Sequence, residues 1–97
     1  METYVILRRH GWRSPEDLDL AAQRALRAGE GMLDDVRWIR TYSLAELDGT
    51  VGTICVYQAT SPEAIRRHAA AADLPVDEIV RVLDTALVQL DPMPISR

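Results

Sequence analysis

The chain has 97 residues, of which 47% are hydrophobic and 27% are charged, which fits one small globular domain and excludes most multidomain enzymes. Fifteen acidic residues outnumber eleven basic ones, and the net charge of −4 disfavours nucleic acid and anionic membranes as partners. A single cysteine excludes an intrachain disulfide. No apolar stretch approaches the roughly 20 residues that span a bilayer, and the first residues predict a strand rather than a signal sequence, so we expect a cytoplasmic protein.

The first part of the chain predicts a strand followed by a helix. Residues 3–9 are short and rich in β-forming side chains, and a glycine soon follows them. Ser14, Pro15 and Glu16 then supply a capping hydroxyl, a proline suited to the first helical position and an acid in the first turn. Apolar residues at helical spacing follow, so we expect a helix over residues 15–28.

The second part predicts a hairpin, a second helix and a last strand. Residues 35–42 and 50–58 read as strands, with a favoured Asp-Gly turn between them. A second Ser-Pro-Glu run at residues 61–63 predicts another helix start, and alanine-rich helical spacing continues to residue 72. Residues 79–83 suit a strand or a helix. We favour a strand because β-branched side chains are frequent there and because it completes a second strand-helix-strand unit.

This element order predicts a ferredoxin-like α+β fold (βαββαβ), with an antiparallel sheet and both helices on one face. We expect a single domain over residues 1–90 and a C-terminal tail at 91–97, which contains Pro92 and Pro94. Residues 84–97 are compatible with a strand, a helix or an arm swapped with a neighbour. Because the core is small and one sheet face lacks helices, we expect a homodimer of the α+β-barrel type.

Side chains alternate between the two faces of a sheet, which sorts the strand residues into two sets. The aliphatic set suits the face beneath the helices and comprises Val5, Leu7, Ile39, Ile54 and Val56. The other set is then predicted on the open face and comprises Tyr4, Ile6, Arg8, His10, Trp38, Arg40, Tyr42, Thr53, Cys55 and Tyr57. Such a face is either a dimer interface without chemistry or a pocket for an aromatic or acidic compound. The candidate pocket or interface residues are Tyr4, Arg8, Trp38, Arg40, Tyr42 and Tyr57.

Three side chains are candidate metal ligands. One thiolate from Cys55 and two imidazoles from His10 and His68 would form a borderline-soft set suited to nickel, zinc or copper. Their spacing matches no known metal motif. Each also has a structural interpretation, because a lone strand cysteine is usually a small buried residue and a helix histidine is usually hydrogen-bonded in or near the core.

Sequence motifs of common enzymes are missing from the chain. It contains no glycine-rich phosphate loop, no serine in a nucleophile elbow and no arrangement of paired carboxylates. Hydrolase and nucleotide-binding functions are therefore disfavoured, and we favour a role without catalysis.

Residues 54–65, which pass from a cysteine-bearing strand into a helix, resemble a family of small bacterial proteins in which an actinobacterial member is described as nickel-binding. The resemblance continues through His68 and the Leu74-Pro75 turn, and it includes Trp38 in an earlier strand, so it covers most of the chain. It implies a ferredoxin-like fold that is commonly dimeric.

The same resemblance implies a metal role for His10, Cys55 and His68 at the matching positions. The chain departs from the family at Gln58, where an acid is expected, and at Asp73, where a glycine is usual. We therefore carry two main hypotheses. The first is a small protein that binds Ni(II) or another transition metal, and the second is a dimeric protein that binds or transforms a small organic ligand. A module that binds another protein through the open face is a third.

Overall fold

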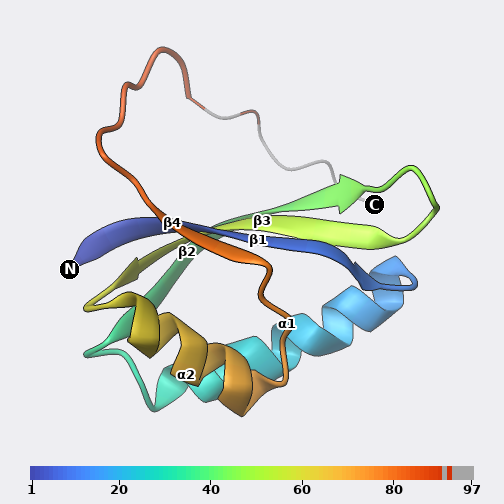
Figure 1. The fold of residues 1–97 in the computed structure, drawn as a ribbon, viewed down its shortest axis with the longest axis horizontal. Coiled ribbons are helices and arrows are strands. Elements are labelled where there is room, and N and C mark those ends of the chain that lie inside the picture. The colour runs from blue at the N-terminus through green and yellow to red at the C-terminus, as the bar shows by residue number, and fades with distance from the viewer. Residues whose placement is uncertain (91, 93–97) are drawn as a thin grey trace.

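The computed structural model of the protein describes residues 1–90 and 92 as a four-stranded antiparallel sheet with two helices against one face (Figure 1). The elements in chain order are β1 (Glu2–Trp12), α1 (Pro15–Glu30), β2 (Val36–Ala45), β3 (Val51–Ala59), α2 (Pro62–Ala72) and β4 (Glu78–Arg81). In space the strands lie in the order β2-β3-β1-β4. This arrangement confirms the predicted ferredoxin-like α+β fold, including the strand after residue 77.

Both helices begin where the sequence predicts. The Ser14 hydroxyl accepts a hydrogen bond from the Asp17 backbone N–H at 3.3 Å, and the Ser61 hydroxyl accepts one from the Ala64 N–H at 3.1 Å. These bonds satisfy N–H groups that the first turn of a helix leaves unpaired. At the other end of α2, Asp73 takes φ of +54°, a conformation natural to glycine and tolerated by aspartate. This backbone geometry would also suit the glycine that the resemblance implies at this position.

The prediction for the two sheet faces is wrong for most of β1 and β3 and for Trp38, where the structure reverses it, whereas Arg40 and Tyr42 lie on the open face as predicted. The residues buried beneath the helices include Tyr4, Ile6, Arg8, Thr53, Cys55 and Tyr57. The aliphatic side chains instead lie half-buried on the face without helices, and they are Val5, Leu7, Ile54 and Val56. The physical reason lies in the helices. Their buried positions are mostly alanine, so the space between helix and sheet is filled by large side chains from the strands.

A bulge in β2 adds a second correction. The pairing of β2 with β3 shifts between Trp38, which faces Tyr57 across the ladder, and Arg40, which faces Val56. Ile39 is the extra residue, and it is 49% exposed rather than buried beneath the helices. Trp38 therefore points towards the helices, whereas Arg40 lies on the opposite face.

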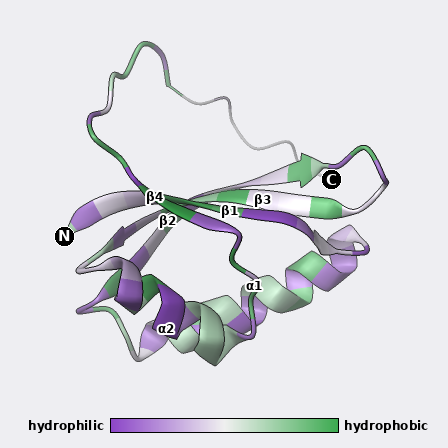
Figure 2. Ribbon diagram, in the orientation of Figure 1, coloured by the Kyte–Doolittle hydropathy of each residue, from purple (hydrophilic) through white to green (hydrophobic). Residues whose placement is uncertain are grey.

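The open sheet face and the chain after β4 both carry apolar side chains. The Val82 N–H still donates to the Thr3 carbonyl at 2.8 Å, and the chain then leaves the sheet without regular structure up to residue 90. Figure 2 shows much of this segment in the hydrophobic colour, and its exposed large residues are Leu83, Leu87, Val88 and Leu90. Of the predicted tail at 91–97, only residue 92 lies within the described residues.

Candidate functional site

Cys55 lies in the middle of β3, buried beneath the helices. Its Sγ accepts a hydrogen bond from the Thr41 hydroxyl at 3.3 Å and lies 3.6 Å from the Thr53 hydroxyl, to which it donates. The Thr41 hydroxyl in turn accepts from the Trp38 indole N–H at 2.6 Å. The thiol is thus one link in a chain of hydrogen bonds across β2 and β3.

His68 is buried on α2, on the side that faces the sheet. Its Nε2 lies 2.8 Å from the Ala25 carbonyl oxygen, which can only accept, so Nε2 carries the proton. The imidazole ring also lies against Tyr57, with 5.6 Å between ring centroids. These contacts are those of a histidine that joins two helices and the core, as its structural interpretation predicts.

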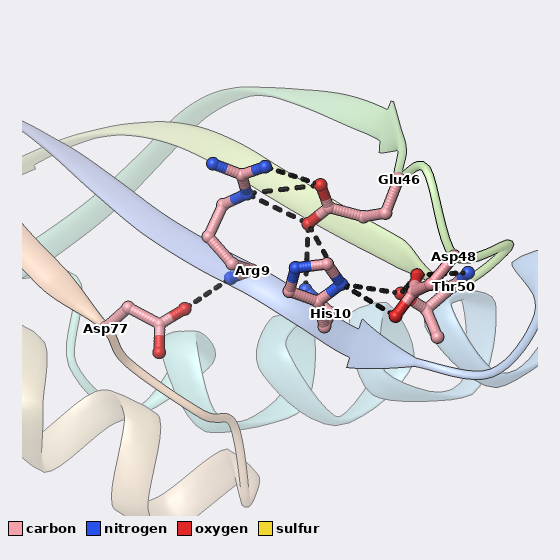
Figure 3. Close-up of polar contacts among 6 residues, drawn as sticks. All are labelled: Arg9, His10, Glu46, Asp48, Thr50 and Asp77. Carbon is pink, nitrogen blue, oxygen red and sulfur yellow. Dashed lines mark hydrogen bonds and ion pairs between the residues drawn. The ribbon is translucent and has the colours of Figure 1, made fainter.

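His10 lies apart from both, at the end of β1 beside the hairpin that joins β2 and β3 (Figure 3). Its φ is +54°, and the pairing of β1 with β3 shifts over this stretch. Half of the side chain is exposed, at 50%. Nδ1 lies 3.0 Å from the Thr50 hydroxyl and 3.1 Å from Oδ2 of Asp48, with a Glu46 oxygen at 3.9 Å.

Two carboxylates hold this end of the hairpin. Glu46 accepts hydrogen bonds from the Arg9 Nε and Nη2 and from the His10 backbone N–H, and these bonds lower its pKa to about 2. Asp48 accepts from the Thr50 hydroxyl and N–H, which lower its pKa also to about 2. Both groups are anionic at neutral pH, and Arg9 gains a raised pKa from Glu46.

Gly52 makes this arrangement possible. A Cβ at this position would lie 2.6 Å from a Glu46 carboxylate oxygen and 2.7 Å from the Arg8 carbonyl oxygen, distances too short for any side chain. Asp77, which directly precedes β4, accepts a hydrogen bond from the Arg9 backbone N–H (Figure 3). The sequence did not single out Glu46, because its partners lie 36 and 37 residues away.

A cavity of about 210 Å³ lies between α1 and the inner face of the sheet. Its sheet side is formed by Arg8, Trp38, Thr41, Ser43, Thr53, Cys55 and Tyr57. Its other walls include Trp12, Leu18, Asp19, Ala21, Ala22, Ala25 and Leu74. Aromatic and aliphatic side chains dominate this lining, with a few polar groups on the strands.

Arg8 is the unusual member of this lining. It is only 1% exposed, and none of its three guanidinium nitrogens has a hydrogen-bond partner among the described residues. Its Cζ lies 5.9 Å from the centre of the Tyr57 ring, a weak cation–π contact. Burial raises the pKa of Tyr57 to about 12, although the nearby Arg8 charge acts in the opposite direction.

The predicted pocket residues are divided between three places. Arg8, Trp38 and Tyr57 line the cavity, and the two rings stack with 6.2 Å between centroids. The remaining three do not line it. Tyr4 belongs to the core, whereas Arg40 donates to the Tyr42 hydroxyl at 3.3 Å beyond the bulge, on the other face. Trp12 also forms a wall of the cavity, although the sequence pattern predicted only the other tryptophan, Trp38, as a pocket residue.

The family described as "Nickel responsive protein SCO4226-like" matches residues 4–82. The chain belongs to this family. A search of curated proteins finds no match. Among solved structures, SCO4226 from Streptomyces coelicolor A3(2) is similar with a TM-score of 0.69 and 20% sequence identity, over 87% of this chain and 99% of that one. At this identity the structural match shows the shared fold.

The SCO4226-like family description raises the question of which residues fit a nickel ion. Within residues 1–90 and 92, no three histidine, cysteine or acidic side chains lie close enough together to hold one metal ion. One chain therefore does not assemble His10, Cys55 and His68 into a single site. His10 and Asp48 form a pair with suitable chemistry, because first-row divalent ions accept imidazole and carboxylate ligands.

Neither helix of the described residues has the length and apolar character needed to cross a bilayer.

Proposed function

We propose that this protein is a nickel-responsive protein that binds Ni(II) through His10 and Asp48 at the end of the hairpin. The observation that supports this proposal most is the approach of the His10 Nδ1 to the Asp48 Oδ2, at 3.1 Å on an exposed surface. The family description supports the choice of metal.

The distance between the two atoms suits a shared ion. Divalent first-row ions bind nitrogen and oxygen at about 2.0–2.2 Å, so two donors in neighbouring positions lie about 3 Å apart. The low pKa of Asp48, about 2, keeps its carboxylate available as a ligand through the neutral range. Two ligands from one chain leave further positions on the ion for water or for a second copy of the protein.

Isothermal titration of protein purified without an affinity tag tests this proposal. We expect saturable Ni(II) binding near pH 7, and we expect His10→Ala and Asp48→Asn each to weaken it by about tenfold or more. Asp34→Asn is a matched control, because it removes an exposed carboxylate far along the chain from this pair, and it should leave the affinity unchanged. Binding that survives His10→Ala but is lost in Cys55→Ala or His68→Ala would refute the assignment.

We also propose that the partner of this chain is a second copy that covers the open sheet face. Four half-buried aliphatic side chains of β1 and β3 lie on that face, and the exposed Leu83, Leu87, Val88 and Leu90 follow β4. Aliphatic side chains on a sheet face that no helix covers favour an interface with another chain. Light scattering should give a dimer mass, and Val56→Asp should shift it towards the monomer. A monomer mass for the unaltered chain at micromolar concentration would refute the dimer.

A further inference from the structure

The cavity beneath α1 contains one group that the fold leaves unsatisfied. The polar side chains across β2 and β3 bond to one another, from the Trp38 indole through Thr41 and Cys55 to Thr53. Arg8 takes no part in this chain: its guanidinium lies near the Tyr57 phenol, yet none of its nitrogens makes a well-formed hydrogen bond with the described residues. An arginine side chain stays protonated in proteins, and a buried cation without a counter-ion is strongly unfavourable.

A carboxylate from a ligand would satisfy this cation. Thr53 lies directly opposite Arg8 in the ladder between β1 and β3, and both line the cavity. Because the Thr53 oxygen accepts from Cys55, its own O–H remains available as a donor in the same cavity. The fork of an arginine matches the two oxygens of a carboxylate, and a neighbouring hydroxyl adds a third hydrogen bond.

The rest of the cavity fixes the kind of molecule that carries the carboxylate. Its volume of about 210 Å³ exceeds the ~150 Å³ of an apolar cavity known to hold benzene. The stacked Trp38 and Tyr57 rings form one side, and Trp12 and the alanines of α1 form others. Flat apolar groups pack well between such walls.

The charges of the lining favour a single negative charge on the ligand. Among the described residues that line the cavity, Arg8 is the one base and Asp19 is the one acid. Asp19 is exposed on α1, so it lies towards solvent while Arg8 lies inside. One buried cation balances one carboxylate, and the acid on the solvent side disfavours a second negative charge.

We propose that this cavity binds a small monocarboxylate with a flat, single-ring apolar body, whose carboxylate pairs with Arg8 and Thr53. The site is separate from the hairpin residues assigned to nickel, and it needs no metal.

Benzoate is the probe that tests the site, with benzamide as its uncharged counterpart of nearly equal shape. The two tryptophans of the protein, Trp12 and Trp38, both line the cavity, so their fluorescence or indole N–H resonances report on its contents. We expect a saturable benzoate response and a benzamide affinity at least tenfold lower. Equal affinities, or no saturable response to benzoate because water alone fills the cavity, would overturn the proposal.

Two substitutions identify the site in different ways. Arg8→Met keeps an unbranched apolar stem and removes the charged guanidinium, so benzoate affinity should fall at least tenfold, whereas Arg8→Lys should retain part of it. Ala22→Leu leaves Arg8 in place but fills the space beneath α1, and it should exclude benzoate as well. Circular dichroism confirms that each variant is folded before the titration.

Benzoate binding that is unchanged in both Arg8→Met and Ala22→Leu would place the ligand elsewhere and overturn the proposal. Ni(II) titrations of the same variants separate the two sites. Nickel affinity should stay unchanged in Arg8→Met, and benzoate affinity should stay unchanged in His10→Ala. The nickel proposal can therefore be refuted without refuting the proposal that the cavity binds a carboxylate.

Discussion

Two consecutive arginines of β1 have opposite surroundings. The Arg9 side chain is 52% exposed, yet it makes a two-pronged ion pair with Glu46. Arg8 is 1% exposed and has no hydrogen-bond partner among the described residues. Because successive side chains of a strand point to opposite faces, one residue step separates a satisfied charge from an unsatisfied one. Arg9 therefore stabilises the hairpin, whereas the buried charge of Arg8 lowers the stability of the fold.

The largest expected effect comes from Gly52, which contacts both regions. An alanine there would press on the Glu46 carboxylate and on the Arg8 carbonyl at once. Since the backbone on one side cannot yield, we expect Gly52→Ala to lower the free energy of unfolding by about 2 kcal/mol or more. Urea denaturation measures this change.

Gly31→Ala is the control for that prediction, because nothing lies within 4 Å of its added methyl group. It should leave stability nearly unchanged. Equal changes of stability in Gly52→Ala and Gly31→Ala would show that the Glu46 carboxylate and the Arg8 carbonyl do not lie this close to Gly52.

Substitution of the two arginines should change the stability of the fold in opposite directions. Arg8→Met removes a buried charge without a partner, so we expect the free energy of unfolding to rise by about 1–3 kcal/mol. Arg9→Met leaves the Glu46 carboxylate, whose side chain is only 3% exposed, without its cation, and thermal stability should fall. Thermal denaturation of both variants at pH 7 makes the comparison, and a loss of stability in Arg8→Met would contradict it.

Acid should affect the Arg9 region in a predictable direction. The pKa of Glu46 is lowered from 4.5 to about 2 in the folded chain, chiefly by the hydrogen bonds from Arg9. A lowered pKa means that the carboxylate stabilises the fold above about pH 4.5, and that this contribution is lost as the pH falls towards 2. In Glu46→Gln the fall in stability over this range should be smaller.

Glu30→Gln removes an exposed carboxylate at the end of α1 and serves as the control. Denaturation midpoints between pH 2 and 7 should show the same acid dependence in this variant as in the unaltered chain. An acid dependence of Glu46→Gln that equals that of the control would mean that the ion pair with Arg9 is not formed in solution.

The smallest expected effect concerns two residues with a left-handed backbone, one of which follows Arg9. His10 and Asp73 both take φ of +54°. Glycine adopts this conformation without strain, whereas alanine does not, so His10→Gly should be more stable than His10→Ala by about 1 kcal/mol. Asp73→Gly should likewise be more stable than Asp73→Ala. Equal stability within either pair would show that the backbone there is not left-handed.

The order of elements could be predicted because its signals are local. Ser14 and Ser61 lie within three residues of the N–H groups they cap, and β-branched side chains near residue 80 favour a strand. The two faces could not be assigned in this way, since both sets of strand residues contain apolar side chains. The informative signal was in the helices, where buried alanines require large partners from the sheet.

The candidate sites were less predictable because their contacts are long-range. Arg8 and His10 were both singled out from the sequence, but the partner that satisfies Arg9 follows the end of β2, 37 residues away. Nothing near Glu46 in the sequence distinguishes it from a solvated acid. Cys55 and His68 were predicted to share a metal, yet each is engaged by neighbours that only the packed fold brings to it.

The bulge at Ile39 has a consequence for how relatives of this chain differ in length. Since Ile39 is the residue left out of the ladder, a relative that lacks it would keep every other pair between β2 and β3. Loss of a residue later in the strand would instead move each following side chain to the opposite face of the sheet. The position of Ser43 on the cavity side would then be taken by an adjacent residue of the strand. Alignments of related sequences should therefore place gaps in β2 at position 39, and length changes elsewhere in that strand should be rare.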